Sequence, residues 1–161
     1  DTVANEPEMV RTYLQVEQVR FGDRLQFEVQ VDTADLQQLT IPKFLLQPIV
    51  ENAVKHGISK LAGKGCIRIR IYEEQGWLNL CVYDNGPVFQ ESLSVGYGIR
   101  SIQEKLKLLY QHEAAVELQN APAKHVCVRV KKELLTKKEF DQEPGKTPAA
   151  TYPGSDAPAT V

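Results

Sequence analysis

Two neighbouring stretches of alternating apolar and polar residues place the strongest constraint on the fold of this 161-residue chain. They are CIRIRIY, residues 66–72, and WLNLCVYD, residues 77–84, and only the short turn EEQG separates them. Successive side chains of a strand point to opposite faces of a sheet, so alternation is typical of strands with one buried and one wetted face. The two stretches therefore predict an antiparallel hairpin.

Further alternation extends the sheet along the chain. It predicts strands at LQFEVQV (residues 25–31), AAVELQN (residues 114–120) and HVCVRVKKEL (residues 125–134). The last two are separated by APAK and read as a second hairpin. A sheet with one wetted face needs helices over its other face.

Three stretches space their apolar residues for helices instead: residues 9–20, 42–57 and 97–110. Pro42 suits the first turn of the second helix, and Gly57 suits its end. The stripes predicted to face the core are Met9, Tyr13, Val16 and Val19 on the first helix and Ile99, Ile102, Leu106 and Leu109 on the third. The element order predicts a two-layer α/β sandwich with a mixed, mostly antiparallel sheet covered on one face by helices.

Composition and charge exclude several classes of function. The formal net charge is -2 and the basic residues are scattered, which argues against binding to nucleic acid or anionic lipid. No apolar run approaches the roughly 20 residues that a membrane-spanning helix needs. Residues 1–10 lack the pattern of a signal peptide.

The cysteines and the last residues complete the domain prediction. Cys66, Cys81 and Cys127 are widely spaced in apolar strand-like runs, which predicts reduced core thiols. Residues 137–161 are rich in Pro, Ala, Thr and Gly and predict a disordered tail or linker, which leaves residues 1–136 as the folded domain.

The second predicted helix carries an unusual amount of polar chemistry. Its segment LLQPIVENAVKHGI interrupts apolar residues with Glu51, Asn52, Lys55 and His56, which form one polar band at helical spacing. Two interpretations stay open. The band is either a solvated face with a Glu–Lys pair, or a site with an amide for Mg²⁺, a lysine for phosphate and a glutamate for a proton.

Two glycine-containing segments downstream offer matching chemistry. Asp84 ends a strand and is followed by Asn-Gly-Pro, which is either a simple turn or an acceptor for an exocyclic amine such as that of adenine. The segment SVGYGI places Gly96 and Gly98 at the start of a helix. Glycines permit close backbone approach there, and a helix N-terminus attracts phosphate.

In this order and spacing, the segments LLQPIVENAVKHGI, YDNGP and GYGIRSIQEKLKLLY resemble the N box and the two glycine boxes of sensor histidine kinases. The resemblance is to their ATP-binding catalytic domain, in the branch that contains the autolysin-regulating sensors, and covers roughly residues 9–135. It implies the Bergerat α/β sandwich of the GHKL ATPases, with ATP and Mg²⁺ as ligands.

The resemblance also implies a role for each matching residue. Asn52 would coordinate Mg²⁺, Glu51 would position or deprotonate the attacking imidazole as the catalytic residue, and Asp84 would bind the adenine amino group. The residues implied to bind the nucleotide are Asn52, Lys55, His56, Asp84, Gly86, Gly96 and Gly98.

The implied activity needs partners outside this sequence. Such kinases transfer the ATP γ-phosphate to a histidine of an upstream dimerisation domain and signal to a response regulator. None of His56, His112 and His125 has the context of that acceptor. The chain is therefore expected to be the cytoplasmic catalytic fragment of a membrane-associated homodimeric sensor of the inner membrane, inactive without its acceptor.

Three departures from the family pattern keep an alternative open. Val88 replaces a glycine of the first glycine box, Tyr97 separates Gly96 and Gly98, and NAPAKHVCV (residues 120–128) replaces the usual Gly-Thr turn. The alternative is a degenerate, non-catalytic interaction module of the same fold. A third option is a serine kinase of the anti-sigma-factor type, which shares these sequence boxes. The residues of the N box resemble the sensor branch more than that kinase.

Overall fold

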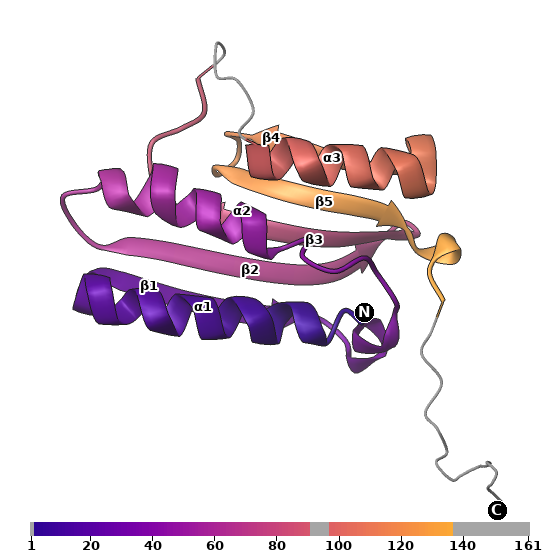
Figure 1. Cartoon of the computed structure of the whole chain (residues 1–161), viewed down its shortest axis with the longest axis horizontal. Coiled ribbons are helices and arrows are strands. Elements are labelled where there is room, and N and C mark those ends of the chain that lie inside the picture. Colours follow the sequence, from indigo (N-terminus) through magenta and orange to yellow (C-terminus); the bar gives the residue numbers. More distant parts are fainter. Residues whose placement is uncertain (1, 91–96, 137–161) are drawn as a thin grey trace, which may run out of the picture.

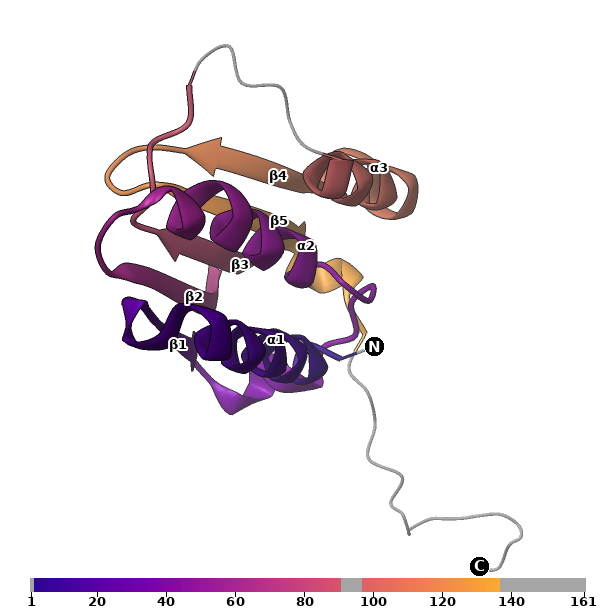
Figure 2. The same cartoon turned by 60° about the vertical axis from the view of Figure 1, so that its left-hand side comes forward.

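A computed structural model describes residues 2–90 and 97–136 of the chain. Within these residues, one five-stranded sheet has the strand order β1-β2-β3-β5-β4. The helices α1, α2 and α3 lie over one of its faces (Figure 1, Figure 2). The elements are α1 Asn5–Phe21, β1 Leu25–Val31, α2 Gln47–Asn52, β2 Gly65–Glu74, β3 Trp77–Asp84, α3 Tyr97–Tyr110, β4 Ala114–Gln119 and β5 His125–Lys131.

This architecture confirms the predicted α/β sandwich with a mixed, mostly antiparallel sheet. β1 pairs with β2 in parallel, and the other neighbouring strands pair in antiparallel fashion. A parallel pair needs a long crossover connection, and the crossover between β1 and β2 contains α2. The β2–β3 hairpin turns through Gln75 and Gly76, whose φ angles of 51° and 85° fit a type I′ turn. The predicted tail, residues 137–161, lies outside the described residues.

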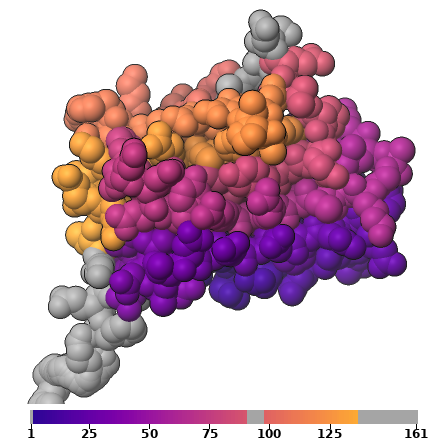
Figure 3. Space-filling model, turned by 180° about the vertical axis from the view of Figure 1, so that it is seen from behind, coloured from indigo at the N-terminus to yellow at the C-terminus, as the bar shows by residue number. Residues whose placement is uncertain are grey.

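Alternation along the strands separates the face under the helices from the opposite face. On β3, Leu78, Leu80 and Val82 are buried in the core under the helices. The intervening Asn79 and Cys81 belong to the opposite face and are also buried. On that face the Arg68 guanidinium lies 4.5 Å from the centroid of the Tyr83 ring. Figure 3 shows this opposite side, where the strands form successive bands of colour.

The cysteines differ from their prediction. Cys81 of β3 and Cys127 of β5 are register partners and form a disulfide with Cα atoms 4.1 Å apart. Cys66 is exposed and free. The prediction of reduced core thiols is therefore wrong, because alternation identifies the face of a residue but not the residue opposite it on another strand.

The helices also differ in part from their predicted stripes. On α1 the buried apolar residues include Val10 and Leu14, which are not in the predicted stripe. Val16 and Val19, which are in that stripe, are 63% and 87% exposed. On α3 the first three members of the predicted stripe are buried, but Leu109 is 57% exposed. α1 begins at Asn5, earlier than predicted, and Glu6 and Pro7 near its start are also buried. No helix among the described residues is long and apolar enough to cross a membrane.

The helix that carries the N-box segment begins at Gln47, not at Pro42, because Phe44 interrupts the backbone with a φ of 62°. It continues beyond Asn52 as a wide π turn, Ala53–Gly57, so its predicted end near Gly57 is confirmed.

A buried carboxylate determines where α2 begins. Glu6 of α1 has no exposed surface, and its Oε1 accepts hydrogen bonds from the backbone N–H groups of Leu45 at 2.8 Å and Leu46 at 3.0 Å. Its Oε2 accepts a third from the N–H of Phe44 at 3.1 Å. A helix N-terminus leaves N–H groups without partners and attracts negative charge. Leu46 is the N-cap residue of α2, so Glu6, from a distant helix, caps one N–H group of the helix terminus and holds the two before it.

We expect Glu6→Gln to lower the free energy of unfolding by about 3 kcal/mol, because the amide removes the charge and turns a donor toward N–H donors. Urea denaturation of the whole chain measures the change. Glu8→Gln, at an exposed position of the same helix, is the matched control and should change stability by less than about 0.5 kcal/mol. Equal effects of the two variants would contradict the capping role.

Candidate functional site

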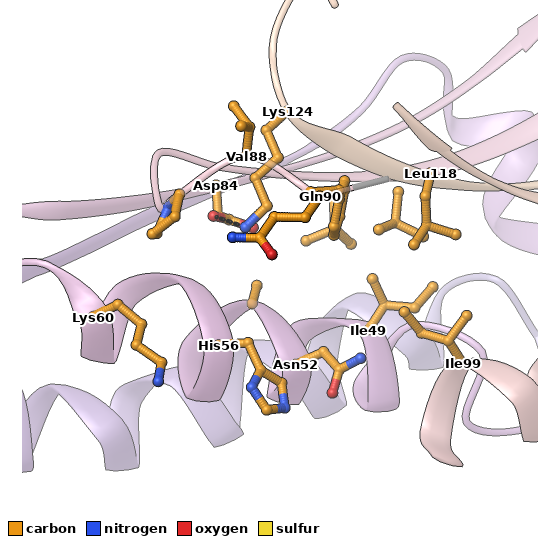
Figure 4. A pocket seen from close by; sticks show the side chains of 15 residues that line it. Ile49, Asn52, His56, Lys60, Asp84, Val88, Gln90, Ile99, Leu118 and Lys124 are labelled. Atoms are coloured by element: carbon orange, nitrogen blue, oxygen red, sulfur yellow. Dashed lines mark hydrogen bonds and ion pairs between the residues drawn. The ribbon is translucent and has the colours of Figure 1, made fainter. Parts of the chain in front are cut away.

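A cavity of about 650 Å³ lies between α2 and the ends of β3 and β5. Figure 4 shows its two sides: α2 and the turn after it carry Asn52, His56 and Lys60, and Asp84 and Lys124 lie opposite. The rest of the wall is mostly apolar and includes Ile49, Val82, Phe89 and Val126. A concave, largely apolar site of this volume with a few polar groups is typical of small-molecule binding.

The predicted polar band of α2 divides into two sets. Asn52 and His56 line the cavity. Glu51 and Lys55 are exposed and are not part of its wall. The π turn that begins after Asn52 widens the helix at this point, a feature that is frequent at functional sites.

The carboxylate of Glu51 is exposed and lies close enough to Tyr13 of α1 to affect its ionisation. It accepts a hydrogen bond from Nε2 of Gln47 at 3.1 Å. Burial, followed by the negative charges of Glu17 and Glu51, raises the pKa of Tyr13 on α1 to about 12. Tyr13 is therefore a neutral phenol near Glu51 at physiological pH.

The opposite side of the cavity centres on Asp84 at the end of β3. Its Oδ1 accepts hydrogen bonds from the backbone N–H of Gly86 at 2.8 Å and from Nζ of Lys124 at 3.0 Å. The side chains of Asp84 and Lys124 are both only 7% exposed. Lys124 was not predicted as a site residue. The one available signal was its position in NAPAKHVCV, the segment that departs from the family pattern.

The loop after β3 is held at Phe89. The backbone N–H of Phe89 donates to Oδ1 of Asn120 at 2.8 Å, and Nδ2 of Asn120 donates back to the carbonyl of Phe89 at 2.9 Å. This reciprocal pair ties the loop to the turn before β5. Val88 is exposed and lines the cavity.

Two glycines let this loop lie against the end of α2. A Cβ on Gly86 would lie 2.7 Å from the carbonyl carbon of Gly57, and a Cβ on Gly57 would lie 2.5 Å from Oδ1 of Asp84. Gly98 meets Pro48 where α3 packs on α2, because a Cβ there would lie 3.2 Å from that ring. Gly86 and Gly98 thus support the walls without lining the cavity, and Gly96 lies outside the described residues.

The metal-binding capacity of the cavity is limited. Among the residues that the structure describes, no group of three or more His, Cys, Asp and Glu could hold a metal ion. The amide of Asn52 offers a single oxygen. Mg²⁺ commonly accepts one or two protein oxygens and takes its other ligands from phosphates and water, so Asn52 fits a metal that arrives with a nucleotide.

Comparison with known proteins relates the chain to sensor histidine kinases. No protein-family model matches it. The sensor histidine kinase BtsS of Escherichia coli is 33% identical over 131 residues, which are 81% of this chain and 23% of BtsS. The sensor histidine kinase YesM of Bacillus subtilis is 30% identical over 114 residues, 68% of this chain and 20% of YesM. The chain thus spans less than a quarter of the length of these relatives.

Solved structures agree on the fold. The catalytic domain of the histidine kinase ThkA matches with a TM-score of 0.59 at 14% identity, over 82% of this chain and 94% of that domain. ThkA in complex with the response regulator TrrA matches with a TM-score of 0.54 at 18% identity, over 78% of this chain and 40% of that one. The chain is therefore homologous to sensor histidine kinases and has the fold of a histidine kinase catalytic domain, as the sequence resemblance predicts.

We expect Gly86→Ala to lower the free energy of unfolding by about 1–3 kcal/mol, because the added methyl group overpacks against the backbone of Gly57. Thermal and urea unfolding measure the loss. Gly63→Ala is the matched control, since a Cβ there meets nothing within 4 Å. A Gly86→Ala chain as stable as the Gly63→Ala chain would show that the loop does not rest on α2.

Proposed function

We propose that this chain binds ATP with Mg²⁺ in the cavity and transfers the γ-phosphate to a histidine, as the catalytic part of a sensor histidine kinase. The observation that carries the proposal is the meeting of Asn52 and Asp84 in one cavity from separate elements. The resemblance assigns these two residues to Mg²⁺ and to adenine. Homology to sensor histidine kinases supports the same activity.

The polar groups of the cavity suit a nucleotide. The oxygen of Asn52 would hold Mg²⁺, which neutralises phosphate charge when bound. His56 and Lys60 lie on the same side of the cavity and supply N–H donors for phosphate oxygens. Asp84 supplies a carboxylate for the adenine amine, and the apolar wall suits the faces of a flat ring.

The exposed residues of α2 suit the transfer step. An imidazole nitrogen of the acceptor histidine attacks the γ-phosphorus, the bond from that phosphorus to the bridging oxygen of ADP breaks, and the imidazole loses a proton. Glu51 lies outside the cavity wall, where a histidine that approaches from another domain can reach its carboxylate. Glu51 would orient that imidazole or accept its proton, and Lys55 would face the phosphates from the same outer side.

The proposed partners follow from this role. They are a histidine-containing dimerisation domain upstream in the longer protein and a response regulator, the class of partner seen with ThkA. The longer protein would be a membrane-associated homodimer of the inner membrane, with this domain on the cytoplasmic side. The same proposal assigns residues 1–136 to the catalytic domain and residues 137–161 to a linker or tail.

Binding of Mg²⁺-ATP should stabilise the chain by about 2.7 kcal/mol at a ligand concentration of about 100 times Kd. Asn52→Ala should remove the part of this gain that depends on Mg²⁺, because it removes the amide oxygen. Thermal unfolding with ATP, with and without Mg²⁺, measures both. Gln103→Ala alters an amide that is not in the cavity wall and should leave the gain intact. An unchanged melting temperature of wild type at millimolar Mg²⁺-ATP would favour the non-catalytic module instead.

The chain alone should form no phosphohistidine from labelled ATP, and it should phosphorylate a separate dimerisation segment of its own longer protein. Glu51→Gln should slow that transfer at least tenfold while ATP affinity changes less than about twofold, because Glu51 acts on the imidazole. Acid-labile radiolabel and calorimetry measure the two quantities. Self-labelling at His56, His112 or His125, or equal losses of transfer and affinity, would contradict these roles.

A further inference from the structure

Lys124 is a buried cation in the wall of the cavity. It lies directly before β5, and its side chain is 7% exposed. Lysine is almost never fully buried without a partner. Here Nζ lies 3.0 Å from Oδ1 of Asp84 and 4.9 Å from the centroid of the Phe89 ring. One carboxylate oxygen and one ring face therefore satisfy the charge.

This pair of charges is not the sole link between β3 and β5 among the described residues. A buried ion pair often contributes no more to stability than well-packed apolar residues in its place, and the surrounding wall is already apolar at Val82 and Val126. Strands β3 and β5 are joined independently by their hydrogen-bonded ladder and by the disulfide. The placement of the pair at the cavity wall thus points to a ligand.

Both partners keep unused hydrogen-bonding capacity. Oδ1 of Asp84 accepts from Gly86 and Lys124, and no described residue donates to Oδ2. An ammonium carries three N–H donors, and the described partners of Lys124 are Asp84 and the Phe89 ring. The wall therefore offers an anionic acceptor and a cationic donor side by side.

We propose that Lys124 and Asp84 together read the Watson–Crick edge of adenine. Asp84 accepts a hydrogen bond from the exocyclic amine, and Lys124 donates one to the neighbouring ring nitrogen N1. This inference rests on the proposed binding of ATP and adds a specificity residue that the sequence resemblance does not assign.

The arrangement distinguishes adenine from guanine. Adenine places its donor amine at position 6 and its acceptor at N1, whereas guanine places an acceptor at position 6 and a donor at N1. The Gly86 N–H and the close approach of Gly57 fix the carboxylate of Asp84. Guanine would therefore turn its O6 toward the carboxylate and its N1–H toward the ammonium, and both contacts are repulsive.

The test is calorimetry of Mg²⁺-ATP and of Mg²⁺-1-deaza-ATP, in which a C–H group replaces N1. The wild-type chain should bind the analogue roughly tenfold more weakly than ATP, the value of one charge-assisted hydrogen bond. Lys124→Met should bind both nucleotides with equal affinity. Lys60→Met is the matched control: it removes another lysine of the same cavity and should keep the tenfold preference, even where both affinities fall.

Three outcomes would contradict the proposed role of Lys124. Equal binding of the two nucleotides by wild type would overturn the role of Lys124 but would leave the proposed binding of ATP standing. This comparison uses wild type alone, so it does not depend on whether a variant folds. Tighter ATP binding by Lys124→Met would also overturn it, because the ammonium would then compete with the base for Asp84. Absence of binding of either nucleotide by wild type would overturn the proposed function together with this inference.

Discussion

The buried carboxylate of Glu6 is the constraint on which the site depends. It collects three backbone N–H groups that lead into α2, from Phe44, Leu45 and Leu46, and so determines both the position and the rotational phase of that helix. Each residue of an α-helix advances the side-chain direction by about 100°. A different start for α2 would therefore turn Asn52 away from the cavity. The first helix thus acts on the site without contributing a residue to its wall.

The opposite wall depends on the junction of β3 and β5. Asp84 ends β3, and Lys124 precedes β5, so the antiparallel register brings them together. The disulfide between Cys81 and Cys127 joins the same two strands close to that junction. The spacing between the carboxylate and the ammonium is therefore fixed by the sheet, while Gly86 leaves room for the loop against α2.

The sequence predicts what is local and misses what depends on register between distant segments. Alternation gave the bounds of β1 and β3 as the structure has them, because side-chain period is a property of the strand itself. The buried face of α1, the start of α2 and the state of Cys81 and Cys127 were predicted wrongly, since each depends on contacts with residues far along the chain. Lys124 was missed for the same reason, whereas Asn52, His56 and Asp84 were predicted from the resemblance and do line one cavity.

The division of the polar band on α2 separates two kinds of chemistry. Asn52 is partly buried and His56 is exposed, and both line the cavity, whose apolar walls would strengthen charged contacts to a nucleotide bound there. Glu51 and Lys55 are exposed, where they can meet a group that another domain delivers. Under the proposed function, this helix carries binding groups in the cavity wall and transfer groups outside it. Under the proposed function, nucleotide binding is complete within this domain, while transfer requires a second domain to approach the outer face of α2.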